Sequence, residues 1–137
     1  MMIDTLNKTI LVVDDDDVNR LITSTMLTQM GANAFVAKSG EEAVKLVEEN
    51  AFDLILMDLE MPDMDGTQTT RNIRSKGHTM PVMAMSAYNS FSGHSRAQQA
   101  GIRVFIRKPI DTDKLSEVLD LLDDEASMEA GMPALSV

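Results

Sequence analysis

The chain has 137 residues, of which 44% are hydrophobic and 25% are charged, the size and composition of one soluble globular domain. Its 22 acidic and 12 basic residues give a formal net charge of −10, which opposes binding to nucleic acid through phosphate contacts. No apolar run approaches the roughly 20 residues of a membrane span, no secretory signal pattern is present, and cysteine is absent. We therefore expect a cytoplasmic protein with no nucleic-acid partner and no membrane contact by this domain.

Apolar runs of strand length alternate with helical patterns along most of the chain. Strands are predicted, in chain order, at residues 9–13, 34–37, 54–57, 82–85 and 104–106. Between the first two strands, four apolar residues have the i, i+3, i+4, i+8 spacing of one helix face, and we expect them to form a buried stripe. These residues are Val18, Leu21, Ile22 and Met26. Gly31 then suits the position after the C-terminus of that helix.

Four further helices follow the later strands. The first of them begins after Ser39, a suitable N-cap, and the next is a polar helix expected at about 67–76. The helix before Gly101 contains poor helix formers at 92–95, so we expect its first turn to be weak or mobile. The last helix follows the breaker Pro109 and has the spacing of a buried stripe. The members of this stripe are Leu115, Val118, Leu119 and Leu122.

Strands that alternate with helices predict an α/β fold, here a doubly wound parallel sheet of five strands with helices on both faces. We assign residues 1–122 to this domain. Residues 123–137 contain four acidic residues and no basic one. We expect this segment to be an acidic tail or a linker stub.

Polar side chains follow four of the five predicted strands. Asp14 and Asp15 follow the first strand, Asp58 the third, Ser86 the fourth and Lys108 the fifth. In doubly wound folds the functional site lies at the carboxyl ends of the strands, near the point where the strand order reverses. We therefore expect these five side chains to converge at one edge of the sheet.

Three carboxylates at one edge indicate a cation site, because two like charges about 4 Å apart repel by about 4 kcal/mol at an effective dielectric constant near 20. Carboxylate, carbonyl and water oxygens are the preferred ligands of Mg²⁺, and Mn²⁺ is an alternative. A carboxylate in such a site can attack phosphorus and form an aspartyl-phosphate, while the cation, a lysine and a hydroxyl stabilise the transferring oxygens. Asp58 has the position expected of the nucleophile.

The remaining acidic residues near these strands have simpler interpretations. Asp16 and Asp17 stand where a helix begins, so we interpret them as helix caps rather than ligands. Asp63 and Asp65 precede Gly66, and turn chemistry explains them better than metal binding. The two histidines of the chain lie in polar segments, where solvent exposure is expected rather than a phosphohistidine role.

Four segments of the chain resemble those of response-regulator receiver domains: ILVVDDDDVNR, DLILMDLEMPDMDG, MPVMAMSA and FIRKPI. Their order, spacing and positions at strand ends make the resemblance specific, and it covers the chain from about residue 8 to residue 122. The resemblance implies a flavodoxin-like fold with strand order 2-1-3-4-5. It also implies a signalling domain that accepts and loses a phosphoryl group by self-catalysed reactions, rather than an enzyme.

The resemblance implies a metal site and a phosphoacceptor. Asp58 would accept the phosphoryl group from a phosphohistidine. Asp15 and Asp58 would bind Mg²⁺ directly, together with the backbone carbonyl of Glu60, and Asp14 would act largely through water.

The resemblance also implies residues that respond to phosphorylation. Ser86 and Lys108 would bind the phosphoryl oxygens, and Ser86 would move together with Phe105 as a switch. Phe105 has no hydroxyl where many family members have tyrosine, so its switch would operate through packing alone. Glu60 and Tyr88 stand where the family tunes its rate of dephosphorylation, in a direction that the residues do not indicate.

The partners implied by the resemblance are a histidine kinase or a histidine phosphotransfer protein. The run VDDDDVNR is similar to receivers of hybrid sensor histidine kinases and favours a phosphorelay. A homodimer through the face of the fourth helix, fifth strand and fifth helix would be consistent with the family. The sequence does not identify the kinase or the downstream target.

Two other classes of function stay open. One is an aspartyl-phosphate phosphotransferase or phosphatase similar to the haloacid dehalogenase-like enzymes. Those enzymes carry an Asp two residues after the nucleophile, where this chain has Glu60, and no cap domain is predicted here. The other is a phosphorylation-independent interaction module, against which the complete acidic site argues.

Overall fold

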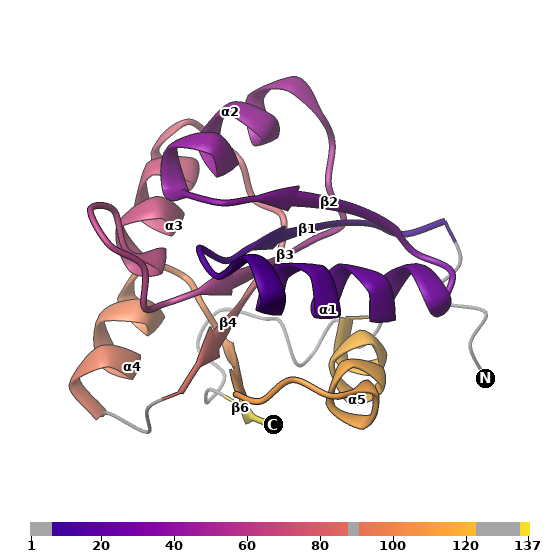
Figure 1. Cartoon of the computed structure of the whole chain (residues 1–137). Coiled ribbons are helices and arrows are strands. Elements are labelled where there is room, and N and C mark those ends of the chain that lie inside the picture. Colours follow the sequence, from indigo (N-terminus) through magenta and orange to yellow (C-terminus); the bar gives the residue numbers. More distant parts are fainter. Residues whose placement is uncertain (1–6, 88–90, 123–134) are drawn as a thin grey trace.

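Strands and helices alternate from Thr9 to Leu122 in the structure, a computed structural model that describes residues 7–87, 91–122 and 135–137 (Figure 1). The strands are β1 (Thr9–Val13), β2 (Asn33–Ala37), β3 (Leu54–Asp58), β4 (Val82–Ser86), β5 (Val104–Arg107) and β6 (Leu135–Ser136). The helices are α1 (Asp17–Gln29), α2 (Gly40–Glu49), α3 (Gly66–Ser75), α4 (Phe91–Gln99) and α5 (Thr112–Leu122). The predicted alternation of strands and helices is confirmed over this range.

All neighbouring strands are parallel, in the order β2-β1-β3-β4-β5-β6. The predicted order of the first five strands is confirmed. The prediction of exactly five strands is wrong, because Leu135 and Ser136 pair with Val104 and Phe105 and add a sixth strand at the β5 edge. The rest of the predicted tail, residues 123–134, lies outside the described residues.

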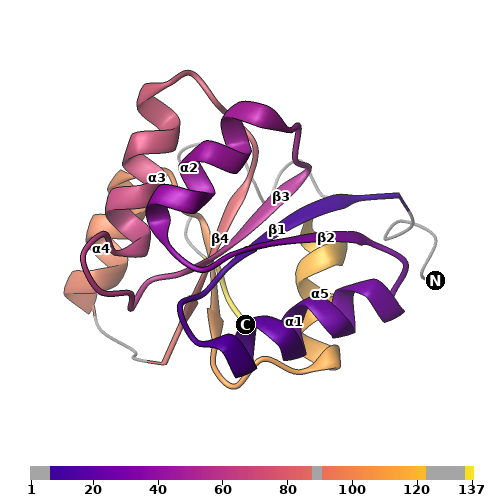
Figure 2. The same ribbon diagram turned by 45° about the horizontal axis from the view of Figure 1, so that its top comes forward.

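Helices cover both faces of the sheet, as Figures 1 and 2 show. Because successive side chains of a strand point to opposite faces, each central strand contributes to two hydrophobic clusters. Leu11 and Ile55 pack in the cluster with α2, α3 and α4, whereas Ile10 and Leu54 pack in the cluster with α1 and α5. Burial on both faces explains why β1, β3 and β4 are continuous apolar runs.

The apolar stripe predicted to be buried on α1 is largely exposed. The exposed fractions of Val18, Leu21 and Ile22 are 64%, 66% and 48%, and Met26 is only half-buried. The face of α1 that packs on the sheet carries instead Thr23, Leu27 and Met30, which are buried. The prediction was wrong because these residues have the spacing i, i+4, i+7 and define a second face, so periodicity alone did not select the covered one.

Side-chain caps explain where several helices begin. Asp16 accepts hydrogen bonds from the backbone N–H groups of α1, and Ser39 accepts one from α2, as predicted. Asp65 caps α3 and forms a reciprocal capping box with Gln68. At the start of α5, the Asp111 side chain accepts a hydrogen bond from the Lys114 N–H group.

The buried face of helix α3 is largely polar, and two of its hydroxyls are paired within the helix. Thr67, Thr69 and Thr70 are buried together with Ile73. The hydroxyls of Thr69 and Thr70 donate to backbone carbonyls one turn earlier, each at 2.8 Å. The polar helix predicted at 67–76 is therefore confirmed.

Helix α4 ends before Gly101, as predicted, with Gly101 at a φ of 100°. The expected mobility of its first turn stays a prediction. No helix within the described ranges is both long and apolar enough to cross a bilayer.

Candidate functional site

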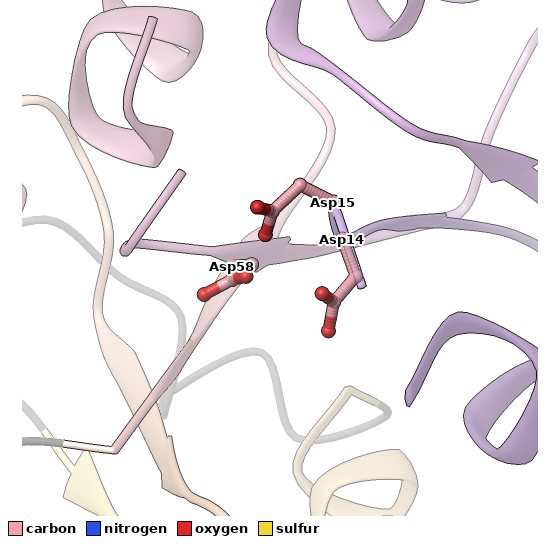
Figure 3. Close-up of side chains that lie close together, drawn as sticks. All are labelled: Asp14, Asp15 and Asp58. Carbon is pink, nitrogen blue, oxygen red and sulfur yellow. The ribbon is translucent and has the colours of Figure 1, made fainter. Parts of the chain in front are cut away.

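The predicted acidic residues meet at the carboxyl ends of β1 and β3, which are neighbours in the sheet (Figure 3). Asp14 and Asp15 directly follow β1, and Asp58 is the last residue of β3. One carboxylate oxygen from each of the three residues lies within 4.8 Å of the others. Asp14 and Asp58 are each only 1% exposed, whereas Asp15 is open to solvent.

Backbone and side-chain contacts hold Asp14 in place. Its backbone N–H donates to the carbonyl of Ala37 on β2 at 3.1 Å, and its carbonyl accepts from Arg20 Nη1 at 2.8 Å. Its carboxylate Oδ1 accepts from the Asp16 N–H at 2.9 Å. The turn from β1 into α1 thus positions the first carboxylate before any ligand is present.

Lys108 lies at the end of β5 and supplies positive charge to the two buried carboxylates. Its Nζ atom is 3.0 Å from Asp58 Oδ1 and 3.8 Å from Asp14 Oδ2. Its backbone N–H donates to the carbonyl of Ser86 at 2.9 Å, which fixes it to the end of β4, and its peptide bond to Pro109 is cis. The predicted convergence of Lys108 with Asp14 and Asp58 is therefore seen in the structure.

Burial and neighbouring charges act in opposite directions on the protonation of Asp58 and Lys108. It raises the pKa of Asp58 from 3.8 to about 7, although the hydrogen bond and charge of Lys108 lower it. Burial lowers the pKa of Lys108, but its hydrogen bond to Asp58 and the charges of Asp58, Asp14 and Glu60 outweigh this and raise it. The ammonium therefore stays charged, whereas Asp58 ionises near neutral pH.

The donor set fits a hard divalent cation. It consists of three carboxylates close enough to share one ion, with the Glu60 backbone at the end of the same strand. One ammonium opposes three carboxylates, so positive charge is still lacking when all three are ionised. The acidic pocket of Asp14, Asp15 and Asp58 could thus bind a divalent metal.

The side chain of Glu60 forms contacts that sequence reasoning missed. Ser86 Oγ donates to Glu60 Oε2 at 2.8 Å, and the Ala87 N–H donates to Glu60 Oε1 at 2.9 Å. The Glu60 N–H donates to Asp58 Oδ1 at 3.0 Å. Glu60 follows β3 and Ser86 is the last residue of the adjacent strand β4, so their positions in the sequence held a signal for this contact. Strand order does not, however, give the reach of a flexible side chain.

Phe105 is buried on β5 and stacks against His94 of α4, with ring centroids 4.2 Å apart and an interplanar angle of 19°. A cavity of about 330 Å³ adjoins both rings, and Ser86 and Val137 also line it. His94 is half-buried, so the solvent exposure expected of it is only partly seen. Tyr88, the second residue predicted to tune dephosphorylation, lies outside the described residues.

A second cavity lies between α1 and the pair Asp14 and Lys108. It has a volume of about 390 Å³ and is lined by residues that include Asp14, Ile22, Lys108 and Ile110. Ile22, one residue of the exposed apolar face of α1, therefore lies beside Asp14 and Lys108.

Comparisons with known proteins support one family. The family model of the response regulator receiver domain matches residues 10–120. The transcriptional regulatory protein ZraR of Escherichia coli K12 is 37% identical over 131 residues, which are 95% of this chain and 30% of ZraR. The sensor protein GacS of Pseudomonas syringae is 36% identical over 115 residues, 80% of this chain and 13% of GacS.

Solved structures agree with this match. The receiver domain of the Francisella response regulator 1452 is 28% identical, with a TM-score of 0.79 over 88% of this chain and 99% of that one. The chain spans less than a third of the length of the curated relatives ZraR and GacS, so the similarity concerns one domain of each. The match to the family model nevertheless covers most of the chain. The chain therefore belongs to the response regulator receiver domain family, the signalling domain of two-component systems.

Proposed function

We propose that this receiver domain takes a phosphoryl group from a phosphohistidine onto Asp58 and changes conformation to signal to a partner. The observation that carries the proposal is the Asp58 carboxylate, buried at the end of β3 with Lys108 Nζ 3.0 Å from its Oδ1 atom. A carboxylate that is held by a cation beside further oxygen ligands can attack phosphorus and form an acyl phosphate.

The contacts of Asp58 favour one of its oxygens as the nucleophile. Lys108 Nζ and the Glu60 N–H both bond Oδ1, and neither of these bonds goes to Oδ2. Oδ2 would form the new O–P bond while the N–P bond of the phosphohistidine breaks and the imidazole leaves with the electron pair. Lys108 and Ser86 would then bind the phosphoryl oxygens and offset their charge.

The acidic pocket would hold Mg²⁺, or Mn²⁺, through Asp15, Asp58 and the backbone carbonyl of Glu60. When bound, the cation supplies positive charge that offsets the charges of the carboxylates and of the phosphoryl oxygens. Asp14 Oδ1 already accepts a bond from the Asp16 N–H, which supports an indirect role for Asp14 through water.

The phosphodonor would be a histidine kinase or a histidine phosphotransfer protein that docks on the exposed face of α1. We call Val18, Leu21 and Ile22 the α1 stripe. The exposed α1 stripe reaches the site through Ile22, which lines a cavity together with Asp14 and Lys108. An apolar surface in this place fits a partner that must bring its histidine to Asp58. The similarity to GacS, a sensor protein, supports a kinase-linked pathway or phosphorelay.

Phosphorylation would add a charge of about −1.5 to −2 to the site, and the surrounding hydrogen bonds must adjust to it. Ser86 and Phe105 would change together, and the cavity beside Phe105 offers space for movement of its ring against His94. Glu60 and Tyr88 would tune dephosphorylation. A homodimer through α4, β5 and α5 would have to accommodate β6, which lies along β5.

Labelling with a small phosphodonor tests the proposed function. The protein is incubated with acetyl phosphate and Mg²⁺, and an acid-stable, base-labile phosphoryl group is sought by intact mass. We expect one group per chain, lost in Asp58→Asn and in the absence of a divalent cation. Asp53→Asn, an exposed change at the other end of β3, is the matched control and should label as the wild type does.

The same assay separates the alternatives. Multiple-turnover release of phosphate from unrelated phosphoesters would indicate a phosphatase or phosphotransferase. Failure to label with any small phosphodonor or phosphohistidine donor would indicate a phosphorylation-independent interaction module.

A further inference from the structure

The Glu60 carboxylate occupies a position between the phosphoacceptor strand and the end of β4. Its two oxygens accept separate hydrogen bonds, from Ser86 Oγ at 2.8 Å and from the Ala87 N–H at 2.9 Å. Its own backbone N–H bonds Asp58 Oδ1 at 3.0 Å. Glu60 thus contacts Asp58 through its backbone and the two donors at the end of β4 through its side chain.

These donors form a small anion-binding pair. A hydroxyl and a backbone N–H, on consecutive residues, hold the two oxygens of a single negative group. Lys108 belongs to the same neighbourhood, because the charge of Glu60 contributes, after those of Asp58 and Asp14, to the raised pKa of Lys108. A phosphoryl group on Asp58 would present similar anionic oxygens to the same hydroxyl, N–H and ammonium.

We propose that the Glu60 carboxylate is an internal competitor of the phosphoryl group, holding the Ser86 hydroxyl and the Ala87 N–H until phosphorylation of Asp58 displaces it. The proposal rests on the function proposed above for Asp58. The phosphoryl group and Glu60 are both negative and cannot share two donors without repulsion. Glu60 is therefore a positioning residue whose displacement accompanies phosphorylation, while the donors exchange one anion for another.

Competition makes Glu60 an obstacle to phosphorylation. Glu60→Ala releases both donors and removes a repelling charge, so labelling by acetyl phosphate should become about three to ten times faster, the factor that corresponds to the net free energy of one ordinary hydrogen bond. Glu60→Gln keeps an acceptor of the same shape without the charge, so its labelling rate should lie between those of the wild type and Glu60→Ala. Glu117→Ala removes an exposed acidic residue on α5 and should leave the rate unchanged.

A double-mutant cycle distinguishes competition from a merely structural role. Because the Ser86 hydroxyl is bonded to Glu60 in the wild type, Ser86→Ala should slow labelling less there than in the Glu60→Ala background. Equal effects of Ser86→Ala in both backgrounds would overturn the proposal. Circular dichroism and thermal unfolding of each variant show that the rates compare folded proteins.

The amide proton of Ala87 gives a second readout. In NMR spectra of the wild type, its chemical shift should change little on phosphorylation, because one anionic acceptor replaces another. In Glu60→Ala it should start at a different chemical shift and move toward the wild-type position when Asp58 is phosphorylated.

The failures of the two proposals are distinguishable. Labelling at Asp58 that is unaffected by Glu60→Ala, with an unchanged Ala87 amide, would overturn the competitor role and leave the proposed function standing. Absence of labelling in the wild type would overturn both.

Discussion

Helices α1 and α5 pack on the same face of the sheet and carry apolar residues at the same helical spacing, yet they use them differently. On α5 the residues Leu115, Val118 and Leu119 are buried, whereas on α1 the stripe of Val18, Leu21 and Ile22 is exposed. The α5 residues stabilise the fold. The α1 stripe, whose member Ile22 lines a cavity with Asp14 and Lys108, contributes little to folding, which is the expected property of a surface that a partner covers.

The acidic site also differs from the buried α5 residues in its effect on stability. Buried carboxylates cost folding free energy, and both Asp14 and Asp58 are buried. Asp14 also lines a cavity together with Ile22 of the exposed α1 stripe. A buried carboxylate that opposes folding and an exposed apolar residue that does not assist it therefore lie beside the same cavity, at the end of the sheet that carries the acidic site. Binding and chemistry at that end explain this arrangement better than stability does.

The largest effect is expected from Leu115→Ala. Leu115 is fully buried between α5 and the sheet, so its truncation should lower the free energy of unfolding by about 2–5 kcal/mol. Urea unfolding followed by circular dichroism measures the change. A loss no larger than that of an exposed leucine would mean that the two helices do not differ in the way described.

Binding of Mg²⁺ at the acidic site should stabilise the folded protein. At ten times its Kd, a cation that binds only the folded protein raises the free energy of unfolding by about 1.4 kcal/mol. The gain should persist in Leu115→Ala and disappear in Asp58→Asn. An undiminished gain in Asp58→Asn would place the cation elsewhere.

Without divalent cations, Asp58→Asn should raise the free energy of unfolding at about pH 8, because it removes a buried negative charge. The gain should be only on the order of 1 kcal/mol, because Lys108 loses its ion-pair partner. The pKa of Asp58 is raised from 3.8 to about 7, so the folded state holds this proton more tightly than the unfolded chain. The resulting stability is fully present below about pH 4 and is lost as the pH rises through about 7.

Urea unfolding of both proteins with a chelator, at several pH values, tests this linkage. The advantage of Asp58→Asn should shrink toward zero in acid, whereas the loss in Leu115→Ala should depend little on pH. A constant advantage at all pH values would show that ionisation of Asp58 is not its cause.

The sheet and the acidic site could be predicted because both follow from rules of strand order. Buried parallel strands are continuous apolar runs, so LILM and VMAM stood out, and their carboxyl ends must share an edge. That reasoning brought Asp14, Asp58, Ser86 and Lys108 together, and the structure agrees. None of it required the position of a flexible side chain.

The features that escaped prediction depend on tertiary contacts. Helix α1 has two faces with helical spacing, and only packing shows that Leu27 is covered and Leu21 is not. Strand β6 is two residues long, and Leu135 pairs with Val104 of β5, 31 positions earlier in the sequence, so no local pattern marked Leu135. The bond from Ser86 to Glu60 spans 26 positions and depends on a rotatable side chain.

The smallest effect on stability is expected from Leu21→Ala. The side chain is 66% exposed, so the free energy of unfolding should change by no more than about 0.5 kcal/mol. If the α1 stripe is the docking surface, transfer from a phosphorylated histidine phosphotransfer protein should nevertheless slow about tenfold, as for truncation of an apolar interface residue worth about 1.4 kcal/mol. Labelling by acetyl phosphate needs no docking and should keep its wild-type rate.

Val36→Ala is the matched control, because Val36 is an exposed apolar residue on the edge strand β2. It should affect neither transfer nor labelling. Equal slowing of both reactions in Leu21→Ala would place its effect in the acidic site rather than in docking. Unchanged transfer would remove the functional reason for the exposure of the α1 stripe, and the contrast with α5 would then concern packing alone.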